Sequence, residues 1–529
     1  MNAARVQKWT LFETQFESHK TYQDPIRDVT LEVRLTDPNG GARHVEAFWD
    51  GGKTWRVRFA PDVVGQWSYA TTCSDAGNIG LHHQIGTFEC VAYTGDNPCY
   101  QHGRVKLSDS RRYLVSDDGS PFFWLACTAW NGALKSDAAS WETYLQNRLE
   151  RGFSVIQFVM TQWRAAKADR EGQLAFTGPN ERIEINPAFF QRMDGKYEAV
   201  NRHGLVASPV MLWAIRGDDN PGYFLPESEA ILLTRYMVAR YGAYHVIWIL
   251  GGDGDYRGEN TERWKRIGQA IFGDHHDRLA TMHPGGLQWV GEEFRNEAWF
   301  SFISFQSGHG DNDNNLKWLT TGPPSRDWDK SPVLPVINQE PNYEAHVSYH
   351  SRNVISPFMV RRAAYWSLLV SPTAGVTYGH HGIWPWPEQR EVPLGHASTG
   401  ESGPWHEAIQ AEGAMYMKVL REFFDGIAWH RLRPAQDVLD AQPGEETPAK
   451  FIAAAMTDAK DLAVIYTPEA GEIRLKTAQL ASPMKAAWVK PDTGKRSEAG
   501  VIGSAPVQAF QTPGDGDWLL VLGKDGGGR

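Results

Sequence analysis

The sequence predicts a three-domain protein in which a central (β/α)8 TIM barrel is flanked by two β-sandwiches. Three observations support this prediction. Apolar and polar residues alternate strictly in the first 105 residues, with hairpin turns between the runs. Buried strands then alternate with amphipathic helices to about residue 430, and short strands with glycine-rich turns return after it. A chain of 529 residues is long enough for roughly three to four domains.

Residues 1–105 are predicted to form an immunoglobulin-like β-sandwich. Apolar side chains occupy every second position over 29–35, and the Asp-Pro-Asn-Gly turn at 37–40 follows. The runs 45–49 and 55–59 repeat the alternation and are separated by Asp-Gly-Gly. Period-two runs joined by Asn-Gly and Asp-Gly turns are typical of β-hairpins, and several short strands at this spacing favour a sandwich.

Residues 106–430 are predicted to form the barrel. Asn186 and the proline after it are placed to begin a helix, whereas Gly152, Gly204 and Gly242 are placed to end helices. A doubly wound open sheet is the alternative, but no G-x-G-x-x-G follows the first strand. The eight strands are expected at 122–126, 155–159, 205–212, 246–250, 279–282, 302–306, 333–337 and 375–378.

Residues 431–529 are predicted to form a smaller C-terminal β-sandwich. A helix over about 405–424 precedes this region. Short apolar strands follow at 463–466, 473–475 and 518–522, with Pro-Asp-Thr-Gly and Gly-Asp-Gly turns between them.

Composition and charge exclude several classes of protein. The 53 Lys and Arg against 63 Asp and Glu give a net charge of −10. Binding to phosphate requires clustered positive charge, so neither a nucleic acid nor an anionic membrane surface is an expected partner. The N-terminus has no apolar signal core, and no run of about 18 apolar residues occurs. The chain as given is therefore predicted to be cytoplasmic, and its oligomeric state is left open.

The content of tryptophan and cysteine is informative. The 22 tryptophans often adjoin Gly, Pro, Asp or His, a setting that suits aromatic platforms for sugar rings as well as core packing. The four cysteines are too few for a disulfide scaffold and form no C-x-x-C pair. Free buried thiols are expected, with a Cys73–Cys90 disulfide as the alternative.

Two carboxylates follow predicted strands of the barrel. Asp253 follows the fourth strand and two glycines, and Glu340 follows the seventh strand. Ligands of such barrels bind at the carboxyl ends of the strands, and glycoside hydrolysis uses a pair of carboxyls that flank the bond. Asp255 competes with Asp253 for the role of the acid, or caps a helix.

Four histidines at strand ends raise the alternative of a metal site. His283, His309, His380 and His381 could supply a His₂-carboxylate zinc site, but no H-E-x-x-H spacing occurs and two of them are adjacent. No G-x-S-x-G elbow supports a serine hydrolase. Hydrogen bonding to sugar hydroxyls or to a carboxylate is the favoured role, and no metal or cofactor is predicted.

An ordered set of motifs resembles a known family. Residues of about 107–430 resemble the apiosidase-like catalytic domain of glycoside hydrolases from bacteria that degrade plant cell-wall polysaccharide. Residues 6–95 are similar to the immunoglobulin-like domain that often precedes it, and the tail is similar to the sandwich, labelled collagen-binding, that often follows it. The motifs are Trp124–Trp130, Val-Met-Thr-Gln-Trp around Thr161, Trp248–Asp253, His283-Pro284-Gly285-Gly286, Gln306-Ser307-Gly308-His309, the segment from Asn338 to Glu344, and Tyr378-Gly379-His380.

This resemblance implies a retaining mechanism, with Asp253 as acid/base and Glu340 as nucleophile. Such sequences commonly carry Asp-Thr-Ala-Trp after the first strand, and this chain has Cys127 in place of that Asp. We therefore expect the sugar subsite to lack one carboxylate, which argues against an apioside as the substrate.

The predicted function is cleavage of a glycosidic bond in a plant-type glycoside, oligosaccharide or polysaccharide. A non-catalytic carbohydrate-binding protein and a metal-dependent hydrolase are the alternatives. The residues predicted to bind the substrate are Trp130, Gln162, Trp163, Trp213, Gln306, His309, Tyr343, Tyr378, His380 and Trp384.

Overall fold

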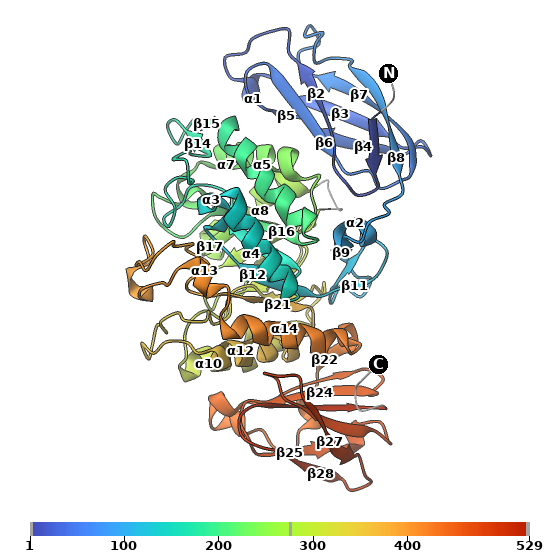
Figure 1. The fold of residues 1–529 in the computed structure, drawn as a ribbon, viewed down its shortest axis with the longest axis vertical. Coiled ribbons are helices and arrows are strands. Elements are labelled where there is room, and N and C mark those ends of the chain that lie inside the picture. Colours follow the sequence, from blue (N-terminus) through green and yellow to red (C-terminus); the bar gives the residue numbers. More distant parts are fainter. Residues whose placement is uncertain (1–3, 274–277, 525–529) are drawn as a thin grey trace.

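The structure is a computed structural model, and it describes residues 4–273 and 278–524. An N-terminal β-sandwich, a barrel and a C-terminal β-sandwich follow one another along the long axis of the molecule (Figure 1). The predicted fold class, a TIM barrel between two sandwiches, is confirmed.

The N-terminal sandwich packs a five-stranded sheet, in the order β1-β8-β7-β3-β4, against a three-stranded sheet, β2-β6-β5. The alternation seen in the sequence fills its core: Leu31, Val33 and Leu35 are fully buried, whereas the residues between them are not. A short helix, α1 (Pro25–Asp28), links β2 to β3. The strands are β1 (Ala4–Gln7), β2 (Phe12–Glu17), β3 (Leu31–Thr36), β4 (Ala42–Glu46), β5 (Phe48–Trp49), β6 (Thr54–Phe59), β7 (Gly65–Cys73) and β8 (Ile85–Val91).

Eight parallel strands form the barrel, and each corresponds to a strand that the sequence predicts. Their order is β18-β17-β16-β13-β12-β21-β20-β19. The strands are β12 (Trp124–Thr128), β13 (Val155–Val159), β16 (Val206–Trp213), β17 (Trp248–Gly254), β18 (Ala280–Pro284), β19 (Ile303–Phe305), β20 (Val336–Asn338) and β21 (Gly375–Tyr378).

The barrel closes between its two outermost strands, β18 and β19. The Ser301 amide donates to the Ala280 carbonyl at 2.8 Å, and the Thr281 hydroxyl donates to the Phe302 carbonyl at 2.6 Å. These few bonds replace a regular ladder at this seam.

Helices follow every strand of the barrel, as a (β/α)8 fold requires. The Asn186 side chain caps α5 as predicted, and Gly152 and Gly204 adopt positive φ just after α4 and α5. The single helix predicted at 405–424 is instead two helices. The helices are α3 (Gly132–Lys135), α4 (Ala138–Glu150), α5 (Pro187–Arg202), α6 (Pro221–Phe224), α7 (Glu227–Tyr241), α8 (Thr261–Phe272), α9 (Gly291–Phe294), α10 (Asp313–Thr321), α11 (Pro323–Arg326), α12 (Pro357–Leu369), α13 (Trp405–Ala408) and α14 (Glu412–Asp425). A two-stranded hairpin, β14 (Phe176–Thr177) and β15 (Glu184–Ile185), precedes α5.

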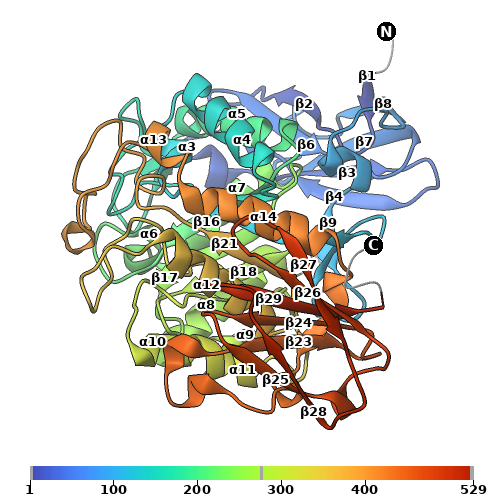
Figure 2. The same ribbon diagram turned by 60° about the horizontal axis from the view of Figure 1, so that its bottom comes forward.

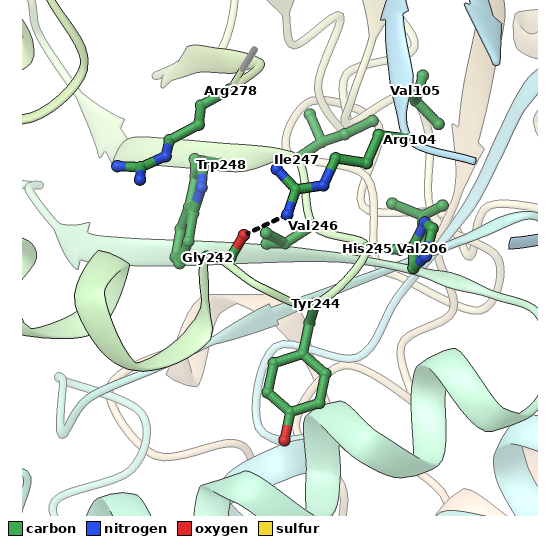
Figure 3. A pocket seen from close by; sticks show the side chains of 10 residues that line it. All are labelled: Arg104, Val105, Val206, Gly242, Tyr244, His245, Val246, Ile247, Trp248 and Arg278. Carbon is green, nitrogen blue, oxygen red and sulfur yellow. Dashed lines mark hydrogen bonds between the residues drawn. The ribbon is translucent and has the colours of Figure 1, made fainter. Parts of the chain in front are cut away.

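A small cap covers the amino ends of the barrel strands. It consists of α2 (Pro98–His102) and the sheet of β9 (Val105–Leu107), β10 (Leu114–Ser116) and β11 (Pro121–Phe122). A hollow of only about 20 Å³ lies beside it, where Arg104 donates to the Gly242 carbonyl at 3.4 Å (Figure 3). This space holds about one water molecule, so the amino end of the barrel is a packed junction.

A buried charge network joins the N-terminal sandwich to the barrel. Arg58 on β6 donates to Asp194 on α5 at 2.9 and 2.7 Å, and Arg240 on α7 donates to the same carboxylate. Arg240 also donates to Asp50 at 2.8 Å. Each buried guanidinium therefore has a carboxylate partner, as the cost of burying a charge requires.

The C-terminal sandwich packs against α12 and α14 of the barrel (Figure 2). A six-stranded sheet, β22-β23-β24-β29-β26-β27, faces a two-stranded sheet of β25 and β28. Arg361 on α12 donates two bonds, of 2.9 and 2.7 Å, to the buried Asp517. The strands are β22 (Leu432–Pro434), β23 (Ala453–Thr457), β24 (Leu462–Thr467), β25 (Glu472–Lys476), β26 (Lys485–Val489), β27 (Arg496–Val501), β28 (Val507–Gln511) and β29 (Trp518–Gly523).

Two smaller predictions concern the whole chain. All four cysteines are buried and free, so the expected thiols are confirmed and the alternative Cys73–Cys90 disulfide is wrong. Within the described ranges, no helix has both the length and the apolar character that a bilayer span demands.

Candidate active site

A pocket of about 360 Å³ opens at the carboxyl ends of the barrel strands. Every one of the eight strands contributes to it, either through its last residues or through the loop that follows, which is the usual construction of a ligand site in this fold. The lining residues are Trp130, Trp163, Arg164, Trp213, Asp253, Gly286, Leu287, Gln306, Gly308, His309, Asn315, Glu340, Tyr343, His346, Tyr349, His350, Trp384 and His396.

Asp253 enters this pocket from a distorted strand end. The register of β17 against β18 shifts between Ile249 and Gly252 and again between Gly252 and Gly254. Asp253 itself has φ of 52°, an uncommon conformation for a residue with a side chain. A Cβ on Gly252 would lie 2.6 Å from Val210, so only glycine fits there. Such bulges and strained residues re-aim side chains at functional sites.

Glu340 enters from the loop after β20 and is held by two histidines. His283 Nε2 lies 3.1 Å from one carboxylate oxygen, and His309 Nε2 lies 3.0 Å from the other. The Tyr343 amide donates to His309 Nδ1 at 3.3 Å, so the ring hydrogen of His309 is on Nε2 and is donated to Glu340.

The two carboxylates are connected through Gln306. Gln306 Nε2 donates to Asp253 Oδ1 at 3.1 Å and lies 3.1 Å from His283 Nε2, which in turn contacts Glu340 at the same distance. The distance between the nearest carboxylate oxygens of Asp253 and Glu340 therefore cannot exceed the sum of these three contacts of 3.1 Å each. Separations compatible with a retaining and with an inverting glycosidase both lie within this limit.

The environments of the two carboxyls shift their pKa values in opposite directions. Burial, and then the nearby charge of Glu340, raise the pKa of Asp253 to about 6, against smaller opposing effects of Arg164, His283 and Gln306. Burial also acts to raise the pKa of Glu340, but the hydrogen bonds from His283 and His309 outweigh it and hold that pKa well below its usual range. Around pH 5, Asp253 is therefore mostly protonated while Glu340 is ionised.

Aromatic rings also line the pocket. The rings of Trp163 and Trp213 lie 4.4 Å apart, and those of Trp130 and Trp213 lie 5.4 Å apart. Trp163 Nε1 donates to Asn131 Oδ1 at 2.8 Å, which fixes the orientation of the indole. With Trp384 from the loop after β21, these rings give the pocket that holds the carboxylates an apolar surface.

Seven of the ten residues predicted to bind substrate line this pocket, and three do not. Gln162 is engaged by the backbone of residues 175 and 176, and His380 Nδ1 accepts from the Gly382 amide at 2.8 Å. Tyr378 is fully buried, and its hydroxyl donates to Glu344 at 2.6 Å. None of these three lines the pocket: Gln162 and Tyr378 direct their polar groups at the protein, and His380 engages Nδ1 in the same way.

Asp255 and Cys127 also lie outside the pocket. Asp255 is exposed and forms an ion pair with Arg257, so the pocket favours Asp253 over it. Cys127 is fully buried, and Arg148 donates to its sulfur at 3.6 Å. A carboxylate at position 127 would therefore not enter the sugar site, and the expected loss of a subsite carboxylate is corrected.

Several lining residues were not predicted as substrate contacts, among them Arg164, His346, Tyr349 and His396. His283 does not line the pocket, but its contact with Glu340 matches the predicted hydrogen bonding of a strand-end histidine to a carboxylate. Arg164 directly follows Trp163, and its Nη2 lies 2.7 Å from His396 Nε2 and 3.8 Å from Asp253. His346, Tyr349 and His396 lie in long loops, where no periodicity marks the direction of a side chain.

Two of the four strand-end histidines, His309 and His381, have protein partners at both ring nitrogens. His381 Nδ1 accepts from Trp384 Nε1 at 3.3 Å, and its Nε2 donates to the Gly400 carbonyl at 3.2 Å. Both nitrogens of His309 are engaged as well. In the part of the chain that the structure describes, no three His, Cys, Asp or Glu side chains are arranged to hold a metal ion.

A (β/α)8 barrel whose strand-end pocket holds two carboxyls and four tryptophans has the construction of a glycoside hydrolase. Similarity to known structures agrees. A solved glycoside hydrolase is 25% identical, with a TM-score of 0.70 over 81% of this chain and 98% of that one. A family 5 glycoside hydrolase from Bacteroides vulgatus ATCC 8482 is 23% identical, with a TM-score of 0.70 over 82% of this chain and 95% of its own. Another structure from that organism, 19% identical with a TM-score of 0.74, shares the fold over 98% and 99% of the two chains.

The chain belongs to the apiosidase-like family. Residues 108–431 match its catalytic domain. Residues 5–74 match a domain of unknown function, and residues 434–523 match a domain described as "Putative collagen-binding domain of a collagenase". No curated protein matches the chain.

Proposed function

We propose that this protein is a retaining glycosidase that acts on a plant-type glycoside or oligosaccharide, with Glu340 as nucleophile and Asp253 as acid/base. The opposite ionisation of two carboxyls in one pocket is the observation that supports this assignment. Pairs of carboxyls whose environments separate their pKa values are how glycosidases divide the two roles.

The reaction proceeds in two steps. The Glu340 carboxylate attacks the anomeric carbon while protonated Asp253 gives its proton to the leaving oxygen, and the glycosidic bond breaks. Ionised Asp253 then takes a proton from water as that water attacks the anomeric carbon, which releases the sugar and restores Glu340. Both histidine contacts keep Glu340 ionised and oriented for the first step.

A screen of aryl glycosides and plant pectic oligosaccharides tests this proposal. Proton NMR of the first-formed sugar gives the anomeric outcome, and net retention is expected. Release of the opposite anomer would reassign Glu340 as a base that activates water. Sugar binding without any hydrolysis across the screen would favour a non-catalytic carbohydrate-binding protein.

Removing the Trp163 ring is expected to weaken catalysis. Trp163→Ala deletes a stacking surface worth on the order of 1–2 kcal/mol, so kcat/KM on a small glycoside should fall about tenfold or more. Trp518→Ala, in the C-terminal sandwich, is the matched control and should leave kcat/KM nearly unchanged. The opposite pattern would place the sugar site in the sandwich.

Chelation separates this mechanism from a metal-dependent hydrolase. Dialysis against EDTA is expected to leave kcat unchanged, because the proposed chemistry uses only carboxyls and water. Activity that disappears on dialysis and returns with added Zn²⁺ would instead favour the metal-dependent alternative.

A further inference from the structure

A buried carboxylate, Glu344, lies four residues beyond Glu340 and outside the pocket. It is 5% exposed. The Tyr378 hydroxyl donates to its Oε2 at 2.6 Å, and the Gly413 amide, in the first turn of α14, donates to both oxygens at 3.0 and 3.1 Å. A Cβ at position 413 would lie 2.3 Å from the carboxylate, so this close approach requires glycine.

The backbone of Glu344 is fixed on both sides. Its amide donates to the Gly379 carbonyl at 3.0 Å, and its carbonyl accepts from the His381 amide at 2.8 Å. The next residue, Ala345, has φ of 62°, a conformation that persists only where the surroundings enforce it. The side-chain and backbone bonds of Glu344 supply that constraint immediately before the strained residue.

The fixed backbone of Glu344 is connected to Glu340 through Tyr343 and His309. Tyr343, the neighbour of Glu344, packs its ring against Gly379, where a Cβ would lie 2.1 Å away. Its amide donates to His309 Nδ1, and His309 Nε2 donates to Glu340 Oε1. If the Tyr343 amide moved, His309 would lose the partner that keeps its hydrogen on the nitrogen facing Glu340.

We infer that Glu344 is a positioning residue: its buried carboxylate holds the Tyr343 amide on His309, and His309 in turn holds Glu340 in its reactive state. The consequence for activity rests on the proposed role of Glu340 as nucleophile. The consequence for the His309 tautomer depends only on the contacts of Glu344, Tyr343 and His309.

Glu340 and Glu344 have different charged and titratable neighbours. Glu340 faces His283 from β18, His309 from the loop after β19 and Asp253 from β17. From the longer loops it also faces Tyr343, His346, Tyr349 and His396. Weakening the His309 bond removes one of the two donors that lower the pKa of Glu340, so that pKa should rise.

Glu344 faces Tyr378 from β21, Arg148 from α4 and Glu412 from α14. It does not line the pocket. A change at Glu344 can therefore alter the titration of Glu340 only through the segment that links them.

The test is Glu344→Gln, which keeps the side-chain volume but turns an NH₂ group toward either Tyr378 or Gly413, both of which are donors. We expect kcat on an aryl glycoside to fall 10- to 100-fold and the acid limb of kcat/KM to move up by about one pH unit, because the nucleophile must be ionised. Tyr378→Phe removes one hydrogen-bond donor from Glu344, so it should move the acid limb of kcat/KM upward by a smaller amount. If Glu344→Gln does not fold, the Tyr378→Phe variant tests the role of Glu344 in its place.

Asp517→Asn is the matched control for lost stability. Asp517 is also a buried carboxylate with a tyrosine donor, but it lies in the C-terminal sandwich, bonded to Arg361 and Tyr466. It should lower Tm without moving the acid limb. A Glu344→Gln enzyme that loses Tm as Asp517→Asn does, with the acid limb unmoved, would reduce Glu344 to a structural role.

Nitrogen-15 NMR of histidine-labelled protein adds a readout that needs no substrate. The His309 resonances, assigned by their loss in His309→Asn, should report the Nε2–H tautomer in the parent protein and a mixture in Glu344→Gln. Unchanged His309 resonances would overturn the inference. If the parent protein hydrolyses no glycoside, the proposed function fails, and the tautomer measurement alone decides the role of Glu344.

Discussion

Glu340→Gln is expected to abolish turnover while the fold and sugar binding persist. The amide keeps the volume of the side chain but is a far weaker nucleophile than a carboxylate, so kcat should fall by at least ~10³-fold. The amide also faces two histidine nitrogens with only one acceptor atom, which predicts a modest loss of Tm. Pre-steady-state kinetics should show no burst of the leaving group, and calorimetry should still detect the sugar.

The stability change of this variant has a definite sign. The pKa of Glu340 is lower in the folded state than in the unfolded chain, so its charge stabilises the fold above the unfolded pKa, and this contribution is lost as the pH falls through the folded value. Glu340→Gln should therefore reduce Tm at neutral pH. Asp255→Asn is the control: it removes an exposed carboxylate near the site, and it should change neither kcat nor Tm appreciably. Substantial turnover by pure Glu340→Gln enzyme would exclude Glu340 as nucleophile.

Much of the architecture could be predicted because buried parallel strands have a clear sequence signature. The run at 246–250 is short, apolar and β-branched, and it precedes two glycines and Asp253. The fold then places the carboxyl ends of all eight strands around one mouth. Knowing two strand-end carboxylates and the fold was therefore enough to predict that Asp253 and Glu340 would share a pocket.

The errors at Cys127 and Tyr378 arose from ignoring the alternation of side chains along a strand. Leu125 and Cys127 pack outward in the core between strands and helices, whereas Trp124 and Ala126 point into the barrel. Tyr378 shares the outward direction of Val376. Strand parity alone could have removed both residues from the site.

The same rule agrees with the predicted hydrogen bond of His283 to a carboxylate, because His283 alternates with the outward-packing Ala280 and Met282 on β18. No such rule applies to His346, Tyr349 or His396. They lie in loops whose path depends on tertiary contacts, such as the bond from Arg164 to His396. The carboxylates and the aromatic residues next to strand ends were thus predictable from sequence, whereas these three residues of the longer loops were not.

Asp253→Asn is expected to produce an enzyme whose activity depends on the leaving group. Without a proton donor, kcat/KM for a glycoside with a poor leaving group should fall ~10²- to 10⁴-fold. For a dinitrophenyl glycoside, whose leaving group needs no proton, the loss should be on the order of tenfold or less. A Brønsted plot of log kcat/KM against leaving-group pKa, steep for the variant and shallow for the parent, measures this difference.

The pH dependence of kcat/KM is a second, independent test of Asp253 as the proton donor. The parent enzyme needs Asp253 protonated, so its kcat/KM should fall as the pH rises above about 6, the pKa to which burial and the charge of Glu340 raise this carboxyl. The variant has no proton to lose at this position, and its alkaline limb should disappear. A limb near pH 6 that persists in Asp253→Asn would assign the acid to another group.

Asp253→Asn should also stabilise the protein, in contrast to Glu340→Gln. The folded pKa of Asp253 lies above the unfolded value, so the protonated carboxyl is favoured by folding at low pH and this advantage is lost as the pH rises through about 6. Above that pH the ionised carboxylate costs at most about 3 kcal/mol, and less because the side chain is partly exposed to solvent. A neutral amide avoids this cost and keeps an acceptor for Gln306. Tm measured at pH 8 should therefore rise while the hydrolysis of poor leaving groups is lost, a combination that a residue serving only the fold would not produce, because its removal lowers Tm.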